Sequence, residues 1–192
     1  MKRILIAAAV LAAGTTVAHA SDFSKGSTAK KMNLFGEAQA MYSGKVVDIT
    51  CELSGNCADN CGNGNRNLGI VREADGKLIM VLKNGQFSFN GATEDLLPFC
   101  NAEVDVDGLM VGDDPDSTSR FYMVQKIRAK GAAEWGKANR WTKAWAKKNP
   151  EAKGKGPWFR RDPRVLKQLA AEGHFGLGAD YDKQWLDENR PQ

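Results

Sequence analysis

Histidine is scarce in this chain of 192 residues, which carries two, His19 and His174. A histidine-rich metal site needs several imidazoles and a catalytic triad needs a partnered nucleophile, so His174 alone supports neither. The sequence also lacks the motifs of a serine nucleophile elbow, a phosphate-binding loop and a calcium loop. Because no catalytic motif is found, the sequence favours a non-enzymatic protein.

Two cysteine motifs are missing as well. The chain has no C-x-x-C pair, the motif of thioredoxin-like proteins, and no C-x-x-C-H, which excludes covalent c-type haem. The cysteine spacing comes near the plant-type [2Fe–2S] pattern without matching it. A periplasmic redox enzyme or electron carrier would need a chromophore, and the sequence offers no motif for one.

Long hydrophobic runs are absent after residue 20. Residues 1–20 have the pattern of a signal peptide: Lys2 and Arg3 precede an uncharged apolar stretch, which ends in the small-x-small sequence Ala18-His19-Ala20. No twin arginine precedes the stretch, which favours Sec-type export. We therefore expect a periplasmic or secreted protein without a membrane span.

The four cysteines are Cys51, Cys57, Cys61 and Cys100. An even number in an exported chain favours disulfides, here two structural ones. A four-thiolate metal site is the alternative, because tetrahedral zinc takes ligands from two backbone segments and copper(I) also accepts thiolates. A mixed arrangement has one disulfide and two free or metal-bound thiols. Zinc or copper is thus the cofactor that this alternative implies.

Five segments have the alternating pattern of β-strands. They span residues 45–53, 68–72, 77–83, 103–111 and 121–128, and residues 93–99 favour one or two helical turns. This order, in which three strands precede a short helix and two further strands follow it, is that of an OB-type barrel. We therefore predict a mainly β protein, a five-stranded OB-type barrel with a helical C-terminal extension.

This topology suggests how the cysteines pair if they form disulfides. The first strand of such a barrel runs antiparallel to the fourth, so the end of the first lies near the start of the fourth. Cys51 and Cys100 both have the parity of the buried strand faces. We expect Cys51 to pair with Cys100 across this seam, and Cys57 with Cys61 in a Gly- and Asn-rich loop.

Charge and tryptophan are unevenly distributed. Residues 21–129 carry 11 basic and 15 acidic side chains, whereas residues 130–167 carry 12 basic and 3 acidic ones. All five tryptophans also follow residue 130. The predicted parts are therefore a signal peptide at 1–20, a leader or short helix at 21–43, the barrel at 44–130 and a basic, tryptophan-rich extension at 131–192.

The extension has helical periodicity. Residues 132–148 place tryptophans along one stripe, and residues 163–172 and 180–189 favour two further helices. Asp162 is the expected N-cap of the second helix, with Pro163 at its first position.

Cationic and aromatic side chains cluster near residue 160. They are Lys153, Lys155, Trp158, Arg160, Arg161 and Arg164. One interpretation is a binding site for an acidic partner protein or an anionic ligand. Another is structural: the tryptophans cover the outside of the barrel, the lysines are a solvated helix face, and the basic segment docks on the acidic barrel. Export argues against nucleic acid as the partner.

Three short motifs occur in one stretch of the chain. They are Gly44-x-Val46-Val47-Asp48 leading to Cys51, the loop Cys57-Ala58-x-x-Cys61, and Gly69-Ile70. Together they resemble exported bacterial OB-fold proteins of poorly defined function. Those proteins have a histidine three residues before the first loop cysteine, where this chain has Ser54. The resemblance covers residues 44–130 and implies a fold and a compartment, but no activity.

We therefore expect an exported, non-enzymatic binding or accessory protein. Its cysteines are structural in this interpretation, and its basic aromatic extension contacts the acidic partner or anionic ligand. The alternative function is a periplasmic metal-handling protein, which binds zinc or copper through the four cysteines.

Overall fold

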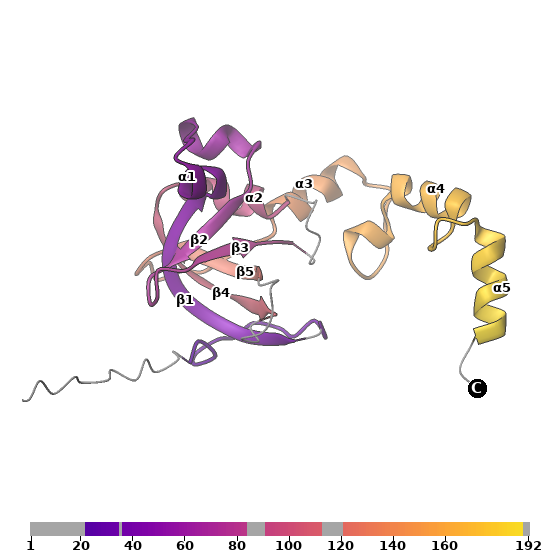
Figure 1. The fold of residues 1–192 in the computed structure, drawn as a ribbon, viewed down its shortest axis with the longest axis horizontal. Coiled ribbons are helices and arrows are strands. Elements are labelled where there is room, and N and C mark those ends of the chain that lie inside the picture. Colours follow the sequence, from indigo (N-terminus) through magenta and orange to yellow (C-terminus); the bar gives the residue numbers. More distant parts are fainter. Residues whose placement is uncertain (1–21, 35, 84–90, 113–120, 190–192) are drawn as a thin grey trace, which may run out of the picture.

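Five strands close into a barrel in the computed structural model, which describes residues 22–34, 36–83, 91–112 and 121–189 (Figure 1). The strands are β1 (Glu37–Asp48), β2 (Leu68–Arg72), β3 (Leu78–Val81), β4 (Glu103–Val111) and β5 (Phe121–Ala129). Their order is β3-β2-β1-β4-β5, and parallel pairing of β3 with β5 closes the barrel. The predicted OB-type barrel is confirmed. The predicted signal peptide lies outside the described residues.

Short helical elements lie at the barrel, and longer ones form the C-terminal extension (Figure 1). Those at the barrel are α1 (Ile49–Ser54), the 3-10 turns η1 (Asp59–Gly64) and η2 (Leu97–Phe99), and α2 (Gly91–Leu96). Those in the extension are the two-residue strand β6 (Gly136–Lys137), α3 (Arg140–Lys148), the 3-10 turn η3 (Trp158–Arg160), α4 (Pro163–Glu172) and α5 (Ala179–Asn189). The predicted helical turns between β3 and β4 are thus confirmed, as are the last two helices.

The 12-residue strand β1 pairs with two neighbours. Its residues 37–45 pair with β4, and its residues 44–48 pair with β2. The change of partner falls at Gly44, where a Cβ atom would lie 2.5 Å from the carbonyl oxygen of Val71. Only glycine allows two backbones to approach so closely, so the course of β1 around the barrel depends on this residue.

β1 differs from the strand predicted over residues 45–53. It begins at Glu37, inside the segment predicted as a leader, and ends at Asp48. The carboxylate of Asp48 accepts a hydrogen bond from the backbone N–H of Thr50 at 2.9 Å and caps α1. It also pairs with the guanidinium of Arg66 at 2.9 Å. A side-chain cap therefore starts a helix where the alternating pattern predicted more strand.

Residues 22–34, which we call the N-terminal strap, lie along β4 and β5. The hydroxyl of Thr28 donates to the carboxylate of Asp107 in β4 at 2.7 Å. The side-chain amide of Gln125 in β5 accepts from the backbone N–H of Lys30 at 2.8 Å and donates to its carbonyl oxygen at 2.7 Å. These bonds make the strap part of the barrel's packing, and it contains no helix.

Aliphatic side chains and two tyrosines fill the barrel. The fully buried residues include Val46, Ile70, Leu96, Val104 and Val106. The rings of Tyr42 and Tyr122 lie with centroids 4.8 Å apart, and the Tyr122 hydroxyl donates to the carbonyl oxygen of Ala40 at 2.7 Å. A second cluster packs beneath the strap and consists of Ala29, Leu82, Leu109, Val111, Phe121 and Met123.

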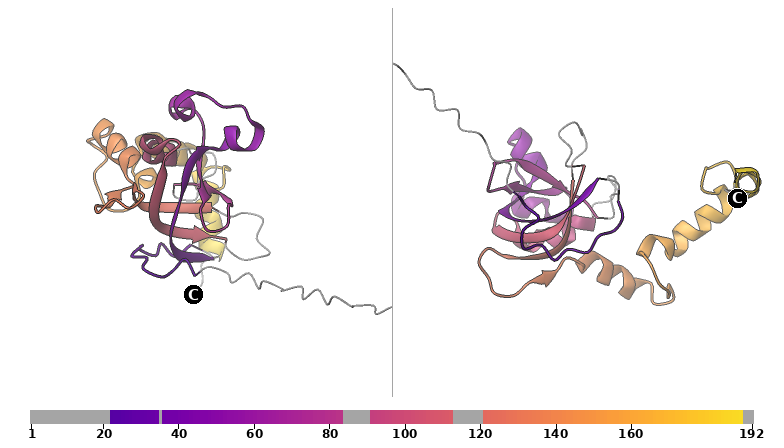
Figure 2. Two further views of the ribbon diagram at one scale, coloured as in Figure 1. Left: turned by 90° about the vertical axis from the view of Figure 1, so that its left-hand side faces the viewer. Right: turned by 90° about the horizontal axis from the view of Figure 1, so that it is seen from below.

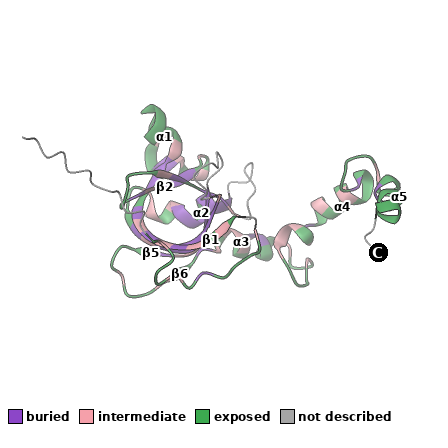
Figure 3. Ribbon diagram, turned by 60° about the horizontal axis from the view of Figure 1, so that its bottom comes forward, coloured by how far each residue is buried: buried purple, intermediate pink, exposed green. Residues whose placement is uncertain are grey.

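The extension stands away from the barrel beyond α3. β6 pairs with β5 and α3 packs on α2, whereas α4 and α5 project away from the barrel in Figure 1 and in the right-hand view of Figure 2. Figure 3 shows the buried residues concentrated in the barrel. The helix predicted over residues 132–148 is shorter in the structure, where α3 spans Arg140–Lys148. The expected docking of the extension on the barrel does not include α4 and α5. Trp135 does cover the barrel, because the guanidinium of Arg128 in β5 lies 4.3 Å from its ring centroid.

Candidate functional site

All four cysteines form disulfides, Cys51 with Cys57 and Cys61 with Cys100. The predicted use of the cysteines in two disulfides is confirmed, but the predicted pairing is wrong. Sulfurs bonded to each other offer no thiolates, so the metal-handling alternative with zinc or copper on these four cysteines is overturned. Within the described ranges, no group of three or more His, Cys, Asp and Glu side chains is placed to hold a metal ion.

The pairing differs because β1 ends at Asp48, before it reaches the first cysteine. α1 follows and ends at Gly55, whose φ of +73° turns the chain back, so that Cys51 meets Cys57. Cys61 is 2% exposed and bonds to Cys100 after η2. The aspartate and glycine that bracket α1 are the cap signals from which this helix could have been predicted.

Three tryptophans form a small core of the extension, which we call the tryptophan hub (Trp141, Trp145 and Trp158). The ring centroid of Trp158 lies 4.4 Å from that of Trp141 and 6.0 Å from that of Trp145. Tilted and edge-on contacts at such distances stabilise aromatic pairs beyond the area that they bury. The hub therefore joins α3 to η3.

Asp162 connects the hub to α4. Its carboxylate is fully buried and accepts a hydrogen bond from the indole N–H of Trp145 at 2.8 Å. It also caps α4 through the backbone N–H of Arg164 at 2.9 Å and pairs with the Arg164 guanidinium at 2.7 and 3.0 Å. These bonds from Arg164 hold the pKa of Asp162 well below its usual range, although burial opposes them. The predicted N-cap is thus confirmed, and it has a second role.

The structure separates the six predicted binding residues into two sets. Trp158 belongs to the hub, and Arg164 pairs with the buried carboxylate. Arg161 donates to the carbonyl oxygen of Ala152 at 2.7 Å, and its guanidinium lies 5.3 Å from the ring centroid of a hub tryptophan. Arg164 is nevertheless 80% exposed. The other three side chains, those of Lys153, Lys155 and Arg160, are exposed and form no ion pair within the described residues. Three of the six residues therefore form contacts within the extension.

Four further cations of α3 are exposed next to these three. Within the described ranges, Arg140, Lys143, Lys147 and Lys148 form no ion pair, and neither do Lys153, Lys155 and Arg160. We call these seven residues the cationic segment. The sequence showed the α3 lysines, but their helical spacing alone does not distinguish a solvated helix face from a binding surface.

The outer part of the extension exposes large apolar side chains. Their exposed fractions range from 41% to 65%, and they are Leu166, Phe175, Leu177, Tyr181, Trp185 and Leu186. The ring of Phe175 lies with its centroid 5.2 Å from that of Trp185 and 6.4 Å from that of Tyr181. We call this set the apolar end.

Comparisons of the chain with protein-family models, with curated proteins and with solved structures found no match. The resemblance of residues 44–130 to exported OB-fold proteins implied a fold. The structure supports that part, since it has a five-stranded mixed barrel with two disulfides. Two disulfides are consistent with a compartment outside the cytoplasm. Among the described helices, none has the length and hydrophobicity needed to cross a membrane.

Proposed function

We propose that this protein is an exported binding protein whose C-terminal extension docks an acidic partner protein. The observation that carries the proposal is the cationic segment, whose seven exposed cations have no ion pair within the described residues. They lie on and just after α3, from which the outer helices continue away from the barrel (Figure 1). Cations without internal partners are available to a second molecule.

The local charge balance favours a strongly acidic partner. Residues 130–167 carry 12 basic and 3 acidic side chains, and one of the acids, Asp162, is buried in the hub. The screening length is about 8 Å at physiological ionic strength, so neighbouring cations of this segment act together on an approaching charge. Such a field speeds encounter with an acidic surface and disfavours basic ones.

The tryptophan hub supports docking because it orders the loop that bears the cations. Binding costs less free energy when the contacting groups are already held in place. Arg161 and Arg164 hold this loop and the start of α4 through the bonds described above. The predicted site is therefore better described as cations on a folded support than as a flexible basic tail.

The apolar end offers a second kind of contact on the same extension. Protein interfaces combine aromatic and aliphatic side chains, which lose water on binding, with polar and charged residues around them. Phe175, Tyr181 and Trp185 are of the types enriched in such interfaces. A partner that spans both parts would gain affinity from the apolar end and specificity from the cations.

The test uses the full chain with both disulfides formed, immobilised and exposed to the exported protein fraction of its native cell. We expect retention of an acidic protein that salt elutes, because exposed charge pairs weaken with ionic strength. Lys153→Glu, Lys155→Glu and Arg160→Glu in one variant should abolish retention. These three are chosen because Arg161 and Arg164 hold the hub, and their loss would disturb the fold of the extension.

A charge-matched control separates a local site from net charge. Lys25→Glu, Lys31→Glu and Lys45→Glu place the same change on exposed positions of the strap and barrel. The control should retain the acidic protein as the unaltered chain does. Equal loss in both variants, or retention of the same protein by the Lys153, Lys155 and Arg160 variant, would overturn the proposal.

A further inference from the structure

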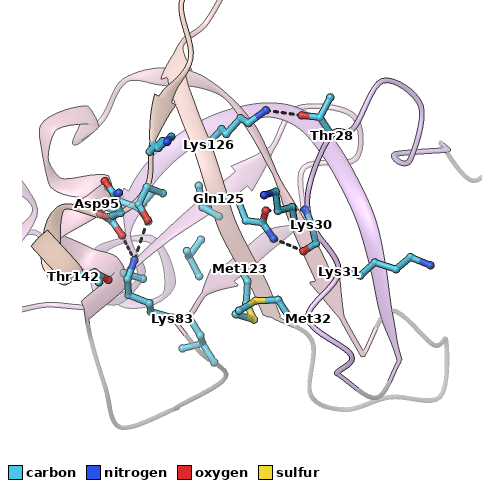
Figure 4. A pocket seen from close by; sticks show the side chains of 18 residues that line it. Thr28, Lys30, Lys31, Met32, Lys83, Asp95, Met123, Gln125, Lys126 and Thr142 are labelled. Carbon is cyan, nitrogen blue, oxygen red and sulfur yellow. Dashed lines mark hydrogen bonds and ion pairs between the residues drawn. The ribbon is translucent and has the colours of Figure 1, made fainter. Parts of the chain in front are cut away.

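A cavity of about 580 Å³ opens at the barrel surface, next to the start of α3 (Figure 4). Its walls come from the N-terminal strap, the end of β3, α2, β5 and the stretch from β6 to α3. The two hydrogen bonds between Gln125 and Lys30 fasten the strap as one wall. This volume lies within the range of about 300–1,000 Å³ that is typical of small-molecule sites.

The floor of the cavity is aliphatic. Leu82, Leu96 and Met123 lie there with exposed fractions of 5% or less, and Met32 of the strap is 48% exposed at its edge. None of the described lining residues is aromatic. Nucleobases and other flat rings are usually bound by stacking on aromatic side chains. The floor therefore suits a flexible aliphatic body better than an aromatic one.

The charge around the cavity is strongly positive. Five lysines line it, together with a single acid, Asp95. The carboxylate of Asp95 is already matched, because it pairs with the ammonium of Lys83 and accepts from the backbone N–H of Arg140. The acid thus leaves little negative charge to attract a cation.

The lysines differ in how their ammonium groups are used. Lys126 donates to the hydroxyl of Thr28 at 2.6 Å, and Lys31 extends away from the cavity (Figure 4). Lys30 and Lys137 form no ion pair and no side-chain hydrogen bond within the described residues. These two ammonium groups, one from the strap and one from β6, are free to meet an anion.

We propose that this cavity binds a small organic anion with an aliphatic body, such as the carboxylate of a medium-chain fatty acid. The chain lies on the floor around Leu96 and Met123, where it leaves water. The head group lies between Lys30 and Lys137 and exchanges its water for charge-assisted hydrogen bonds. The site shares one wall, from Lys137 to Thr142, with the start of the extension, but the proposal does not depend on the proposed partner binding.

The test measures displacement of the fluorescent probe anilinonaphthalene sulfonate from the full chain, at detergent concentrations below micelle formation. Dodecanoate should displace the probe about tenfold more effectively than dodecyltrimethylammonium, which has the same chain and the opposite charge. Acetate, which has the head group without the chain, should not displace it. Equal displacement by the cation, or by acetate, would overturn the proposal.

Single charge reversals locate the head group. Lys30→Glu and Lys137→Glu should each weaken dodecanoate binding about fivefold or more, because each removes one cation and adds a repulsive charge. Lys31→Glu is the matched control, since its ammonium points away, and it should leave the affinity within about twofold. Equal weakening by all three variants would show a diffuse surface effect and contradict the assigned site.

Methyl NMR of the methionines locates the chain independently of charge. Dodecanoate should shift the signals of Met32 and Met123, which line the cavity, and leave those of Met41 and Met80, which do not. Shifts confined to Met41 and Met80 would place the ligand elsewhere and overturn the proposal. This NMR measurement uses the unaltered protein, so it tests the proposal even if one of the lysine variants folds poorly.

Discussion

The carboxylate of Asp95 in α2 caps the start of α3, since it accepts a hydrogen bond from the backbone N–H of Arg140 at 2.6 Å. Asn139, the residue before α3, makes no side-chain cap of its own. The first N–H groups of a helix need acceptors, and a negative charge suits that end of the helix dipole. A carboxylate of the barrel therefore helps anchor the whole extension.

Asp95→Asn should destabilise the protein by about 1–3 kcal/mol, because the ammonium of Lys83, a side chain that is only 13% exposed, loses the charge that balances it. Urea denaturation measures this change. The extension should also become more susceptible to proteolysis between β5 and α3. Glu94→Gln, an exposed neighbour on the same helix, is the control and should change stability by less than about 0.5 kcal/mol. Equal effects of the two substitutions would show that the anchor contributes nothing.

Asp162→Asn should loosen the extension and leave the barrel folded. The substitution removes the charge that pairs with Arg164 and weakens the acceptor of the Trp145 indole, at a cost of about 1–3 kcal/mol. All five tryptophans follow residue 130, so tryptophan emission reports on the extension. We expect a red shift at neutral pH. Asp180→Asn, in the exposed first turn of α5, should cause none.

Because the Asp162 carboxylate stabilises the hub in its ionised form, we expect the extension to loosen at acid pH. The pKa of Asp162 is lowered in the folded state, so its ionised form stabilises the hub. This stabilisation is complete well above the unfolded-state pKa of about 4 and is lost as pH falls below that value. Tryptophan emission of the unaltered chain should therefore shift between about pH 4 and pH 2. Asp162→Asn should lack this step, and an identical acid shift in that variant would refute the assignment.

The barrel could be predicted from sequence because its strands alternate and a short helical segment falls between the third and the fourth. β1 was misplaced because alternation continues past Asp48, where a side-chain cap decides the structure instead. That local error moved Cys51 out of the predicted seam and produced the wrong disulfides. The cap at Asp48 thus decides the disulfide partner of Cys100, which lies more than fifty residues further along the chain.

The candidate sites were less predictable, because they depend on contacts between distant segments. Nothing in the sequence near Arg161 and Arg164 shows that these cations serve the hub while Arg160 is exposed. The cavity is harder still, since its walls come from the strap, three barrel elements and the start of the extension. Short-range periodicity carries no information on such assemblies.

Tyr42 and Tyr122 form a matched pair for a core test. The Tyr122 hydroxyl donates to a backbone carbonyl oxygen at 2.7 Å, whereas the Tyr42 hydroxyl has no hydrogen-bond partner among the described residues. Tyr122→Phe should cost about 1 kcal/mol, because it leaves that carbonyl group without its donor. Tyr42→Phe should be neutral or slightly stabilising, because it removes a buried hydroxyl that has lost its water without gaining a hydrogen bond. Thermal unfolding distinguishes these outcomes, and a larger loss for Tyr42→Phe would contradict them.

The two disulfides should differ in what they contribute to stability. Cys51–Cys57 closes a sequence separation of 6 and Cys61–Cys100 one of 39. A crosslink that closes a longer loop removes more entropy from the unfolded chain, which gives about 2 and about 4 kcal/mol for the two. Chemical denaturation of the Cys51→Ala/Cys57→Ala and Cys61→Ala/Cys100→Ala variants measures the difference. The second pair also joins buried Cys61 to the end of η2, so its loss should loosen η1 as well. Equal losses, or a greater loss for the first pair, would show that loop entropy does not govern these crosslinks.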